Sequence, residues 1–417
     1  MSSTNIFNLG ELIELRRSIH KYAEPSFKEH KTKAKIRSYL ISKGVVEAQI
    51  TEMAKTGLVV DIRGKGPPTS AESKVVALRA DMDALVMKEQ NYHLPYRSVT
   101  NAAHMCFHDG HVVSLLGAIA KLLENLEELP GNHTARFLFQ PAEEKFGGAK
   151  LMVQEGCLLD VQEVWGLHFY PCNPPNTVHV KSGVANAGTR AYKITVLGKE
   201  GHSSLKSKLI NPVSALCDFN VSFEKILRTK YSEENEKLFT ICFPRASASP
   251  SNNVISRKAR MEGVLRYLDH NAAVRIDEEL RMLAVAIGKK YNTVVTVKLV
   301  SEFPVVTNAD HLCEALKHIC PATRDYPTER MGADDFSELS TVVPGCYFMF
   351  FVGAQNNQTL HCDSLDFNDD CLEPAAELLY NIVRSRLSMA PGKVQKKELV
   401  RRKSLIEQEE PPSMLMD

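Results

Sequence analysis

One thiol, one carboxylate and three imidazoles lie within eight consecutive residues in the first third of the chain. The reactive side chains of this segment are His104, Cys106, His108, Asp109 and His111. Cysteine thiolates and neutral imidazoles are preferred ligands of zinc and of its neighbours among the divalent metals. The cluster therefore indicates a metal site, although the same residues could instead form a polar cap at a helix end.

The segment that follows the cluster has the pattern of a buried helix. From Val112 to Leu126, apolar side chains recur at intervals of three and four residues, the period of an amphipathic helix. Asp109 stands where an N-cap residue would stand, and its carboxylate could accept hydrogen bonds from the first free amides. We therefore expect Asp109 to cap this helix and the cluster to lie in the turn before it.

Three short apolar runs have the length of buried strands, and each is followed by acidic residues or a histidine. The runs at 75–78, 135–139 and 164–167 precede Asp81 and Asp83, Glu143 and Glu144, and His168. Helical patterns lie between these runs, and alternating strands and helices are typical of a parallel sheet covered on both faces. Ligands bind such sheets outside the carboxyl ends of the strands. The sequence thus predicts a site for these side chains at that edge of the sheet.

The adjacent glutamates Glu143 and Glu144 could divide two tasks in a metal-dependent hydrolysis. Neighbouring side chains in extended or turn backbone point in different directions, so one carboxylate can bind metal while the other faces the substrate. A metal lowers the pKa of bound water to roughly 7, and a nearby carboxylate can take its proton during attack on a carbonyl. No G-x-S-x-G motif, Walker loop or dinucleotide-binding glycine fingerprint occurs, which argues against serine hydrolases and nucleotide-dependent enzymes.

A segment of different character interrupts this α/β pattern. Between 186 and 302 the expected order is strand, helix, strand, strand, helix, strand, which is typical of a ferredoxin-like α+β sandwich. The edge of its sheet could pair with a second copy of the chain. We therefore predict an α/β fold with a mixed, mostly parallel sheet covered by helices and an inserted ferredoxin-like dimerisation domain. The expected parts are 1–185 and 303–390 for the catalytic domain, 186–302 for the inserted domain and 391–417 for a disordered tail.

The composition is that of an ordinary soluble protein. With 44% hydrophobic residues, 24% charged residues and a net charge of +1, the chain gives no reason to expect a nucleic acid or a membrane surface as partner. The N-terminal segment lacks the apolar core of a signal peptide, and no later run reaches membrane-spanning length. The ten cysteines show no paired spacing, as expected for reduced thiols. These features favour a cytoplasmic location.

Eight motifs occur in the order typical of one enzyme family. They are RADMDAL at 79–85, CFHDGH at 106–111, QPAEE with GGAK at 140–150, WGLH at 165–168, GKEGH at 198–202, NVI at 253–255, MGADDF at 331–336 and LH at 360–361. From about Leu12 to about Leu387 the chain resembles the metal-dependent amidohydrolases that include hippurate hydrolase, bacterial N-acyl-amino-acid hydrolases and plant auxin-conjugate hydrolases. The resemblance implies a zinc-exopeptidase-like catalytic domain that hydrolyses N-acyl-amino acids to a carboxylic acid and a free amino acid.

The resemblance also implies roles for individual residues. The positions that match the metal ligands of the family are Cys106, which would bridge two ions, His108, Glu144, His168 and His361. The positions that match its catalytic and substrate-binding residues are Glu143, His202, Asn253 and Arg266. Glu143 would be the general base, His202 would polarise the scissile carbonyl in the other subunit of a homodimer, and Asp83 with Asp81 would orient the metals from behind. Two divalent ions per subunit are implied, and zinc, manganese and cobalt all suit such a mixture of donors.

The chain departs from the family pattern beside the predicted ligands. Phe107 stands where relatives usually carry glycine, so we expect a less free backbone and a narrower pocket there. Lys145 replaces a small residue, and Ser256 replaces a proline. Because all ligand positions are filled, these departures concern substrate choice more than catalysis. Two alternatives stay open: a metallodipeptidase or aminopeptidase-like hydrolase, and a metal-dependent binding protein that has lost turnover.

The remaining histidines and the tryptophan are expected in positions without a direct catalytic role. Trp165 is expected in the core, and His104 and His111 are expected to be caps or partners behind the ligands. The histidines expected at surface or packing positions are His20, His30, His93, His133, His179, His270, His311 and His318.

Overall fold

The chain is divided into two compact units. In this computed structural model the described residues are 6–68, 72–145, 147–231, 239–249, 251–326, 331–353 and 358–388. The first unit contains the described residues of Met1–Gly183, Thr307–Thr328 and Glu338–Asp417, and the second contains those of Val184–Val306 and Glu329–Ser337. The predicted tail at 391–417 lies outside the described residues.

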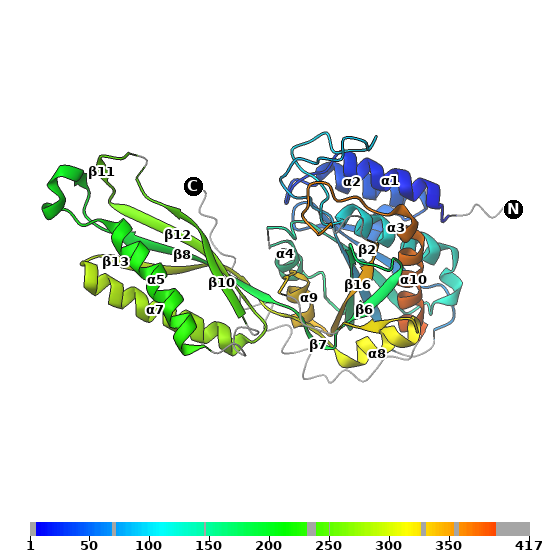
Figure 1. Ribbon diagram of the computed structural model, residues 1–417. Coiled ribbons are helices and arrows are strands. Elements are labelled where there is room, and N and C mark those ends of the chain that lie inside the picture. The colour runs from blue at the N-terminus through cyan, green and yellow to red at the C-terminus, as the bar shows by residue number, and fades with distance from the viewer. Residues whose placement is uncertain are drawn as a thin grey trace. The chain divides into compact units, whose positions relative to one another are not determined.

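An eight-stranded sheet with the order β1-β2-β4-β3-β5-β16-β6-β15 forms the centre of the first unit (Figure 1). The neighbours β4, β3, β5 and β16 run parallel to one another, whereas β1, β2 and β6 join the sheet antiparallel. The strands are β1 (Ile50–Met53), β2 (Gly57–Arg63), β3 (Val75–Asp81), β4 (Thr134–Gln140), β5 (Glu163–Tyr170), β6 (Thr177–Val180), β15 (Arg324–Asp325) and β16 (Gly345–Phe351). The predicted mixed, mostly parallel sheet is confirmed, and the three apolar runs are its neighbouring strands β3, β4 and β5.

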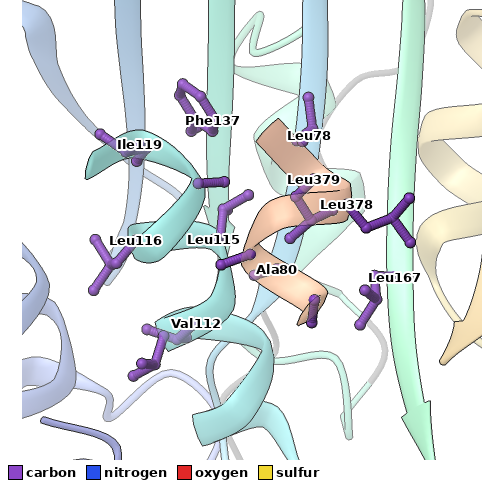
Figure 2. Close-up of a cluster of buried hydrophobic side chains, with 14 of the residues drawn as sticks. Leu78, Ala80, Val112, Leu115, Leu116, Ile119, Phe137, Leu167, Leu378 and Leu379 are labelled. Atoms are coloured by element: carbon purple, nitrogen blue, oxygen red, sulfur yellow. The ribbon is translucent and has the colours of Figure 1, made fainter. Parts of the chain in front are cut away.

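Helices α3 and α10 pack on this sheet and form much of its core. Figure 2 shows Leu115 and Leu116 of α3 and Leu379 of α10 in one buried cluster with Leu78 of β3 and Phe137 of β4. Each such fully buried side chain stabilises the fold by about 1.5–3 kcal/mol. The helices are α1 (Leu9–Lys21), α2 (His30–Ser42), α3 (His108–Glu124), α4 (Gly148–Gln154), α8 (Asp310–Ile319), α9 (Phe336–Val342) and α10 (Leu372–Ser388). Among the described residues, no helix has the length and apolar character needed to cross a lipid bilayer.

The second unit is a four-stranded antiparallel sheet with two helices on one face (Figure 1). Its elements in chain order are β8 (Gly188–Leu197), α5 (Pro212–Lys230), β10 (Phe239–Ser247), β12 (Lys258–Tyr267), α7 (His270–Tyr291) and β13 (Val294–Phe303). The sheet order β10-β12-β8-β13 confirms the predicted ferredoxin-like arrangement. Buried and half-buried residues alternate along β12, because only one face is covered by helices. Short strands are β7 (Gly183–Asn186), β9 (Gly201–His202), β11 (Val254–Ile255) and β14 (Val306–Asn308).

Candidate metal centre

Most of the predicted metal-binding side chains converge at the carboxyl ends of the parallel strands. Strands β3, β4 and β5 deliver Asp81, the pair Glu143 and Glu144, and His168. The turn before α3, the start of α3 and the loop between β16 and α10 add Cys106, His108 and His361. The site thus lies where α/β sheets of this kind bind ligands.

Two sets of three donors share the thiol of Cys106. One set is Cys106, His108 and His168, and the other is Cys106, Glu144 and His361; within each set the donor atoms lie within 4.8 Å of one another. The mixture of sulfur, nitrogen and oxygen suits zinc and its neighbours. The buried Nε2 of His108 has no hydrogen-bond partner among the described residues, as expected of a nitrogen that is used for a metal. The residues present therefore fit a metal site.

Backbone carbonyls fix the orientation of two of these imidazoles. Nδ1 of His108 donates to the carbonyl oxygen of Asp83 at 2.9 Å, and Nδ1 of His168 donates to that of Phe169 at 2.6 Å. Because a carbonyl only accepts, each neutral ring carries its proton on Nδ1 and leaves Nε2 with a free lone pair. Nε2 of His168 lies 3.5 Å from the sulfur of Cys106. Both rings are therefore held in the tautomer that a metal ligand needs.

His111 lies beside the donor sets, but both of its nitrogens are already bonded. Its Nδ1 donates to Asp81 at 2.5 Å, and its Nε2 accepts from the backbone N–H of Phe169 at 2.8 Å. The other carboxylate oxygen of Asp81 lies 2.8 Å from Arg79. Burial opposes ionisation of Asp81, yet Arg79, His108 and His111 hold the pKa of this carboxyl well below its usual range. His111 is thus a partner of Asp81 and has no nitrogen left for a metal.

Two buried carboxylates hold the loop that carries the paired glutamates. Asp83 accepts hydrogen bonds from the backbone N–H groups of Glu143 and Glu144 at 3.0 and 3.1 Å. Glu29 accepts one from the N–H of Ala142 at 2.9 Å. Ala142 has a φ of 53°, in the left-handed region that residues with a Cβ rarely adopt. The carboxylates therefore stabilise a turn that the local sequence alone would not favour.

The electrostatics of the donor sets favour a cation. Burial raises the pKa of the Cys106 thiol, and the nearby Glu144 carboxylate raises it further. Hydrogen bonds to Cys106 and Glu144 raise the pKa of His361 to about 10. Burial lowers the pKa of His168 well below its ordinary range. A thiolate and a carboxylate this close repel each other, so a divalent cation between them would stabilise both deprotonated forms.

The start of α3 differs from the prediction. The residue at the N-cap is Phe107, with φ 65° and ψ 18°, and Asp109 lies inside the first turn. The prediction that Asp109 caps the helix was wrong, because its carboxylate instead accepts from Arg16 at 2.8 Å and from His20 at 2.9 Å. The ring of Phe107 is buried and packs edge-on against Phe367, with 5.3 Å between ring centroids. It fills the core instead of narrowing the site.

The contribution of α1 to the site was not predicted from the sequence. His20 was expected at a surface or packing position; it is 1% exposed, and in addition it makes ion pairs with two carboxylates that were not predicted. Arg16, one helical turn earlier, is also fully buried. The available signal was spacing, because Arg16 and His20 share their helical face with the core residues Leu12 and Ile19.

The predicted residues of the second unit lie in two places. His202 lies on β9, which pairs with β11, and the N–H of Ser203 donates to the carbonyl of Asn253 at 3.0 Å. This pairing brings the exposed residues His202 and Asn253 together. Arg266 lies near the end of β12, where it donates to the carbonyl of Met331 at 3.0 Å. Within the second unit, Arg266 is thus held on a different strand from the other two.

A mostly parallel sheet that carries sulfur, nitrogen and oxygen donors at its strand ends is suited to bind metal ions. The chain belongs to peptidase family M20/M25/M40, whose sequence profile matches residues 77–385. It is 30% identical to N-acetylcysteine deacetylase of Bacillus subtilis (strain 168) over 371 residues, which cover 88% of this chain and 94% of that protein. It is 33% identical to thermostable carboxypeptidase 1 of Saccharolobus solfataricus over 355 residues, covering 83% and 86% of the two chains.

A solved structure supports the same relationship. The YXEP protein of Bacillus subtilis, a dinuclear metal binding peptidase of the M20 family, matches with a TM-score of 0.76 and 27% identity. The match covers 92% of this chain and 99% of that chain. Together with the family assignment, these relatives identify the chain as a hydrolase of amide bonds, as the sequence predicted.

Proposed function

We propose that the chain hydrolyses the amide bond of N-acyl-amino acids and that it uses two divalent metal ions. The observation that carries this proposal is that the thiol of Cys106 belongs to both donor sets, so one thiolate could bridge two ions. His108 and His168 would complete one ion's ligands, and Glu144 and His361 the other's. Zinc, manganese and cobalt are all compatible with these donors.

The names of the relatives support the substrate class. An N-acetylcysteine deacetylase removes an acyl group from an amino acid, and a carboxypeptidase releases an amino acid from the end of a peptide. In both reactions the leaving amine belongs to an amino acid with a free carboxylate. We therefore propose that recognition of this carboxylate is shared, and that Asn253 and Arg266 contribute to it.

Glu143 is the proposed general base. Glu143 is 6% exposed, and its carboxylate lies with donor atoms of His108 and Glu144 in a further set within 4.8 Å. The two ions would supply Lewis acidity toward the amide carbonyl and the attacking water. Glu143 would take a proton from this water as the water oxygen bonds to the acyl carbon. It would then give that proton to the amide nitrogen as the C–N bond breaks, which releases the acid and the amino acid and restores the carboxylate.

We further propose a homodimer in which His202 acts in the active site of the partner. The outer strands β10 and β13 of the second unit leave sheet edges that could pair with another copy. His202 is exposed, and its Nδ1 lies 2.7 Å from the hydroxyl of Ser204, which leaves Nε2 for another group. Donation from Nε2 to the carbonyl oxygen would stabilise the negative charge that develops during attack.

Peptide substrates form the second candidate, because the carboxypeptidase relative is 33% identical. A panel of four compounds separates the possibilities: an N-acetyl-amino acid, its amide lacking the free carboxylate, an N-blocked dipeptide and a dipeptide with a free amine. We expect the first compound to be cleaved and its amide to be spared. Cleavage restricted to the two peptides would favour a peptidase, and cleavage of none would favour a binding protein.

Metal dependence is tested on the same preparation. The protein is stripped with a chelator, its metal content is measured, and zinc or manganese is then added back in steps. We expect activity to disappear with the metal and to return with two ions per chain. Full activity in protein shown to contain no metal would refute the proposal.

A further inference from the structure

A group of buried charges lies behind the start of α3. Arg16 and His20 of α1 both contact the same oxygen of Asp109, at 2.8 and 2.9 Å. The other ring nitrogen of His20 lies 3.2 Å from Glu89. All four side chains are 0–3% exposed. We refer to Arg16, His20, Glu89 and Asp109 as the His20 network.

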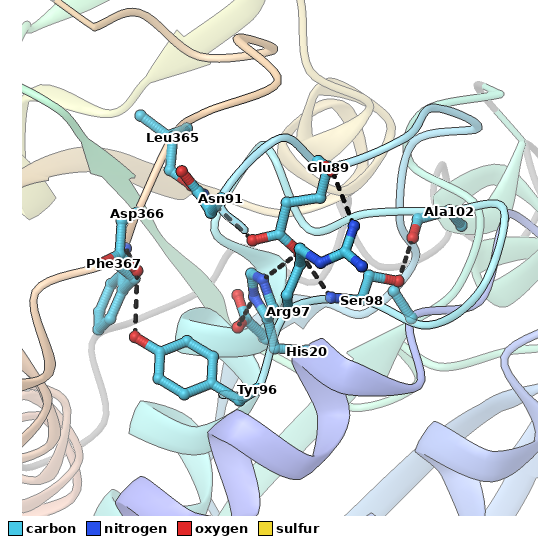
Figure 3. Close-up of polar contacts among 12 residues, drawn as sticks. His20, Glu89, Asn91, Tyr96, Arg97, Ser98, Ala102, Leu365, Asp366 and Phe367 are labelled. Carbon is cyan, nitrogen blue, oxygen red and sulfur yellow. Dashed lines mark hydrogen bonds and ion pairs between the residues drawn. The ribbon is translucent and has the colours of Figure 1, made fainter. Parts of the chain in front are cut away.

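The His20 network continues to the loop that carries His361. Figure 3 shows Glu89 in contact with both His20 and Asn91. Nδ2 of Asn91 donates to Glu89 at 3.1 Å and to the carbonyl of Leu365 at 2.9 Å. The backbone N–H of His361 itself donates to the carbonyl of Met105, at 2.7 Å. The segment before α3 and the His361 loop are therefore joined directly and also through the network.

Further contacts tie the same loop to α1 and to the segment around Glu89. The guanidinium of Arg16 forms an ion pair with Asp369, and the hydroxyl of Tyr96 donates to Asp366 at 3.2 Å. The backbone N–H of Gln90 donates to the carbonyl of Asp363 at 2.7 Å. Together with the bond between His361 and Met105, contacts from three separate segments thus restrain the loop between His361 and α10.

We propose that the His20 network positions metal ligands by setting the separation of Cys106 from His361. This inference rests on the proposed function, because it assigns the Cys106–Glu144–His361 set to one of two ions. The other set depends less on the network, since His108 and His168 are each oriented by a nearby backbone carbonyl. Weakening the network should therefore affect one ion much more than the other.

The energetics of buried ion pairs support a positioning role. Desolvation of the charges offsets most of their attraction, so a buried pair is on average a weak source of stability compared with apolar packing. The His20 network places four ionisable groups where apolar residues could have filled the same volume. These four groups lie between two segments that carry metal ligands. A role in positioning those ligands therefore explains their presence better than a contribution to stability does.

Two variants test the proposal without leaving a buried carboxylate unpaired. Glu89→Gln keeps the shape of the side chain and removes its charge, and Asn91→Ala removes the link to Leu365 without altering any charge. Each purified variant is equilibrated with graded concentrations of free zinc, and the zinc retained per chain is measured. We expect one of the two equivalents to bind about tenfold more weakly, in the range found when groups behind metal ligands are altered. The other equivalent should bind as in the unaltered protein.

Glu163→Gln is the matched control. Glu163 forms a buried ion pair with Arg386 at 2.7 Å, at the opposite end of β5 from His168. Five residues of strand place it roughly 16 Å from that histidine. This variant should lower the midpoint of thermal unfolding without changing the affinity for either zinc equivalent.

The outcomes separate the two proposals. If Glu89→Gln and Asn91→Ala lose thermal stability as the control does but bind both equivalents normally, the network is only structural and the inference is wrong. Equal weakening of both equivalents would also contradict it. If the unaltered protein binds none of zinc, manganese and cobalt, the proposed function fails and this inference fails with it.

Discussion

Substitutions of Phe107 should separate two opposing contributions of this residue to stability. Its ring is buried against Phe367, and loss of a buried phenylalanine ring typically costs about 3–5 kcal/mol. Its backbone has a φ of 65°, which costs a residue with a Cβ about 1–2 kcal/mol. Phe107→Ala removes the ring and keeps the Cβ, whereas Phe107→Gly removes both.

The free energy of unfolding should therefore be about 1 kcal/mol higher for the glycine variant than for the alanine variant. Leu116 is the matched control, because it is fully buried in the middle of α3. There Leu116→Gly should be about 1 kcal/mol less stable than Leu116→Ala, since glycine is a poor helix former. The difference between glycine and alanine thus changes sign between the two positions.

Urea unfolding of the metal-free variants measures these differences without a contribution from ion binding. The single tryptophan, Trp165, lies buried in β5, so its fluorescence reports on the first unit. A Phe107→Gly protein that is no more stable than Phe107→Ala would show that the backbone at this position is not strained. The reasoning from its left-handed conformation would then be refuted.

Three further predictions concern catalysis, pH and assembly. Glu143→Gln should lower turnover about 10²–10⁴-fold with nearly normal metal content, whereas Glu144→Gln should lose one ion per chain. If metal analysis of the two variants shows the reverse, the roles of Glu143 and Glu144 are exchanged. Burial lowers the pKa of His20, and repulsion by Arg16 lowers it further. The carboxylates of the His20 network outweigh both effects and raise the pKa of His20 to about 9. The pKa of His20 is higher in the folded protein than in the unfolded chain, so protonation of His20 stabilises the fold. This contribution to the free energy of unfolding should be fully present below about pH 6.5. It should be lost as the pH rises through 9, which lowers the stability by about 3 kcal/mol. Unfolding free energies of the native protein and His20→Gln should therefore converge between pH 6.5 and 9.5, and a constant difference would contradict the assignment. Equal co-expression of Glu143→Gln and His202→Ala chains should restore about a quarter of full activity if His202 acts across a two-fold dimer. Absence of rescue in mixed dimers confirmed by differential tags would place His202 in its own chain's site or outside the reaction.

The strands of both units could be predicted because their burial follows simple periods. Runs such as 75–78 are apolar at every position, as expected when both faces of a parallel strand are covered. In β8, Tyr192, Ile194 and Val196 are buried and alternate with more exposed neighbours, because helices cover one face only. The order of these two kinds of strand was enough to identify the sheet and the ferredoxin-like unit.

Contacts between distant segments could not be predicted in the same way. Asp109 is a suitable N-cap residue by type and position, but Arg16 and His20, 93 and 89 residues away in sequence, bind its carboxylate instead. Local preference carries no information about such competitors. Phe107 was a partial exception, because its place at a position usually occupied by glycine already indicated a constrained backbone. The sequence did not reveal that its ring points into the core.

The strained backbone around the donor sets has a consequence for metal binding. Phe107, Ala142 and His361 have φ values of 65°, 53° and 67°, and none of them is glycine. Each is held by contacts beyond its own segment: Phe107 by core packing, Ala142 by Glu29 and His361 by the carbonyl of Met105. The rest of the fold maintains this strain and so keeps the donor side chains in place before an ion binds. Less of the free energy of metal binding is then needed to order the loops. Phe107→Gly should therefore exceed Phe107→Ala in stability and yet bind metal more weakly, because glycine frees the segment that carries Cys106.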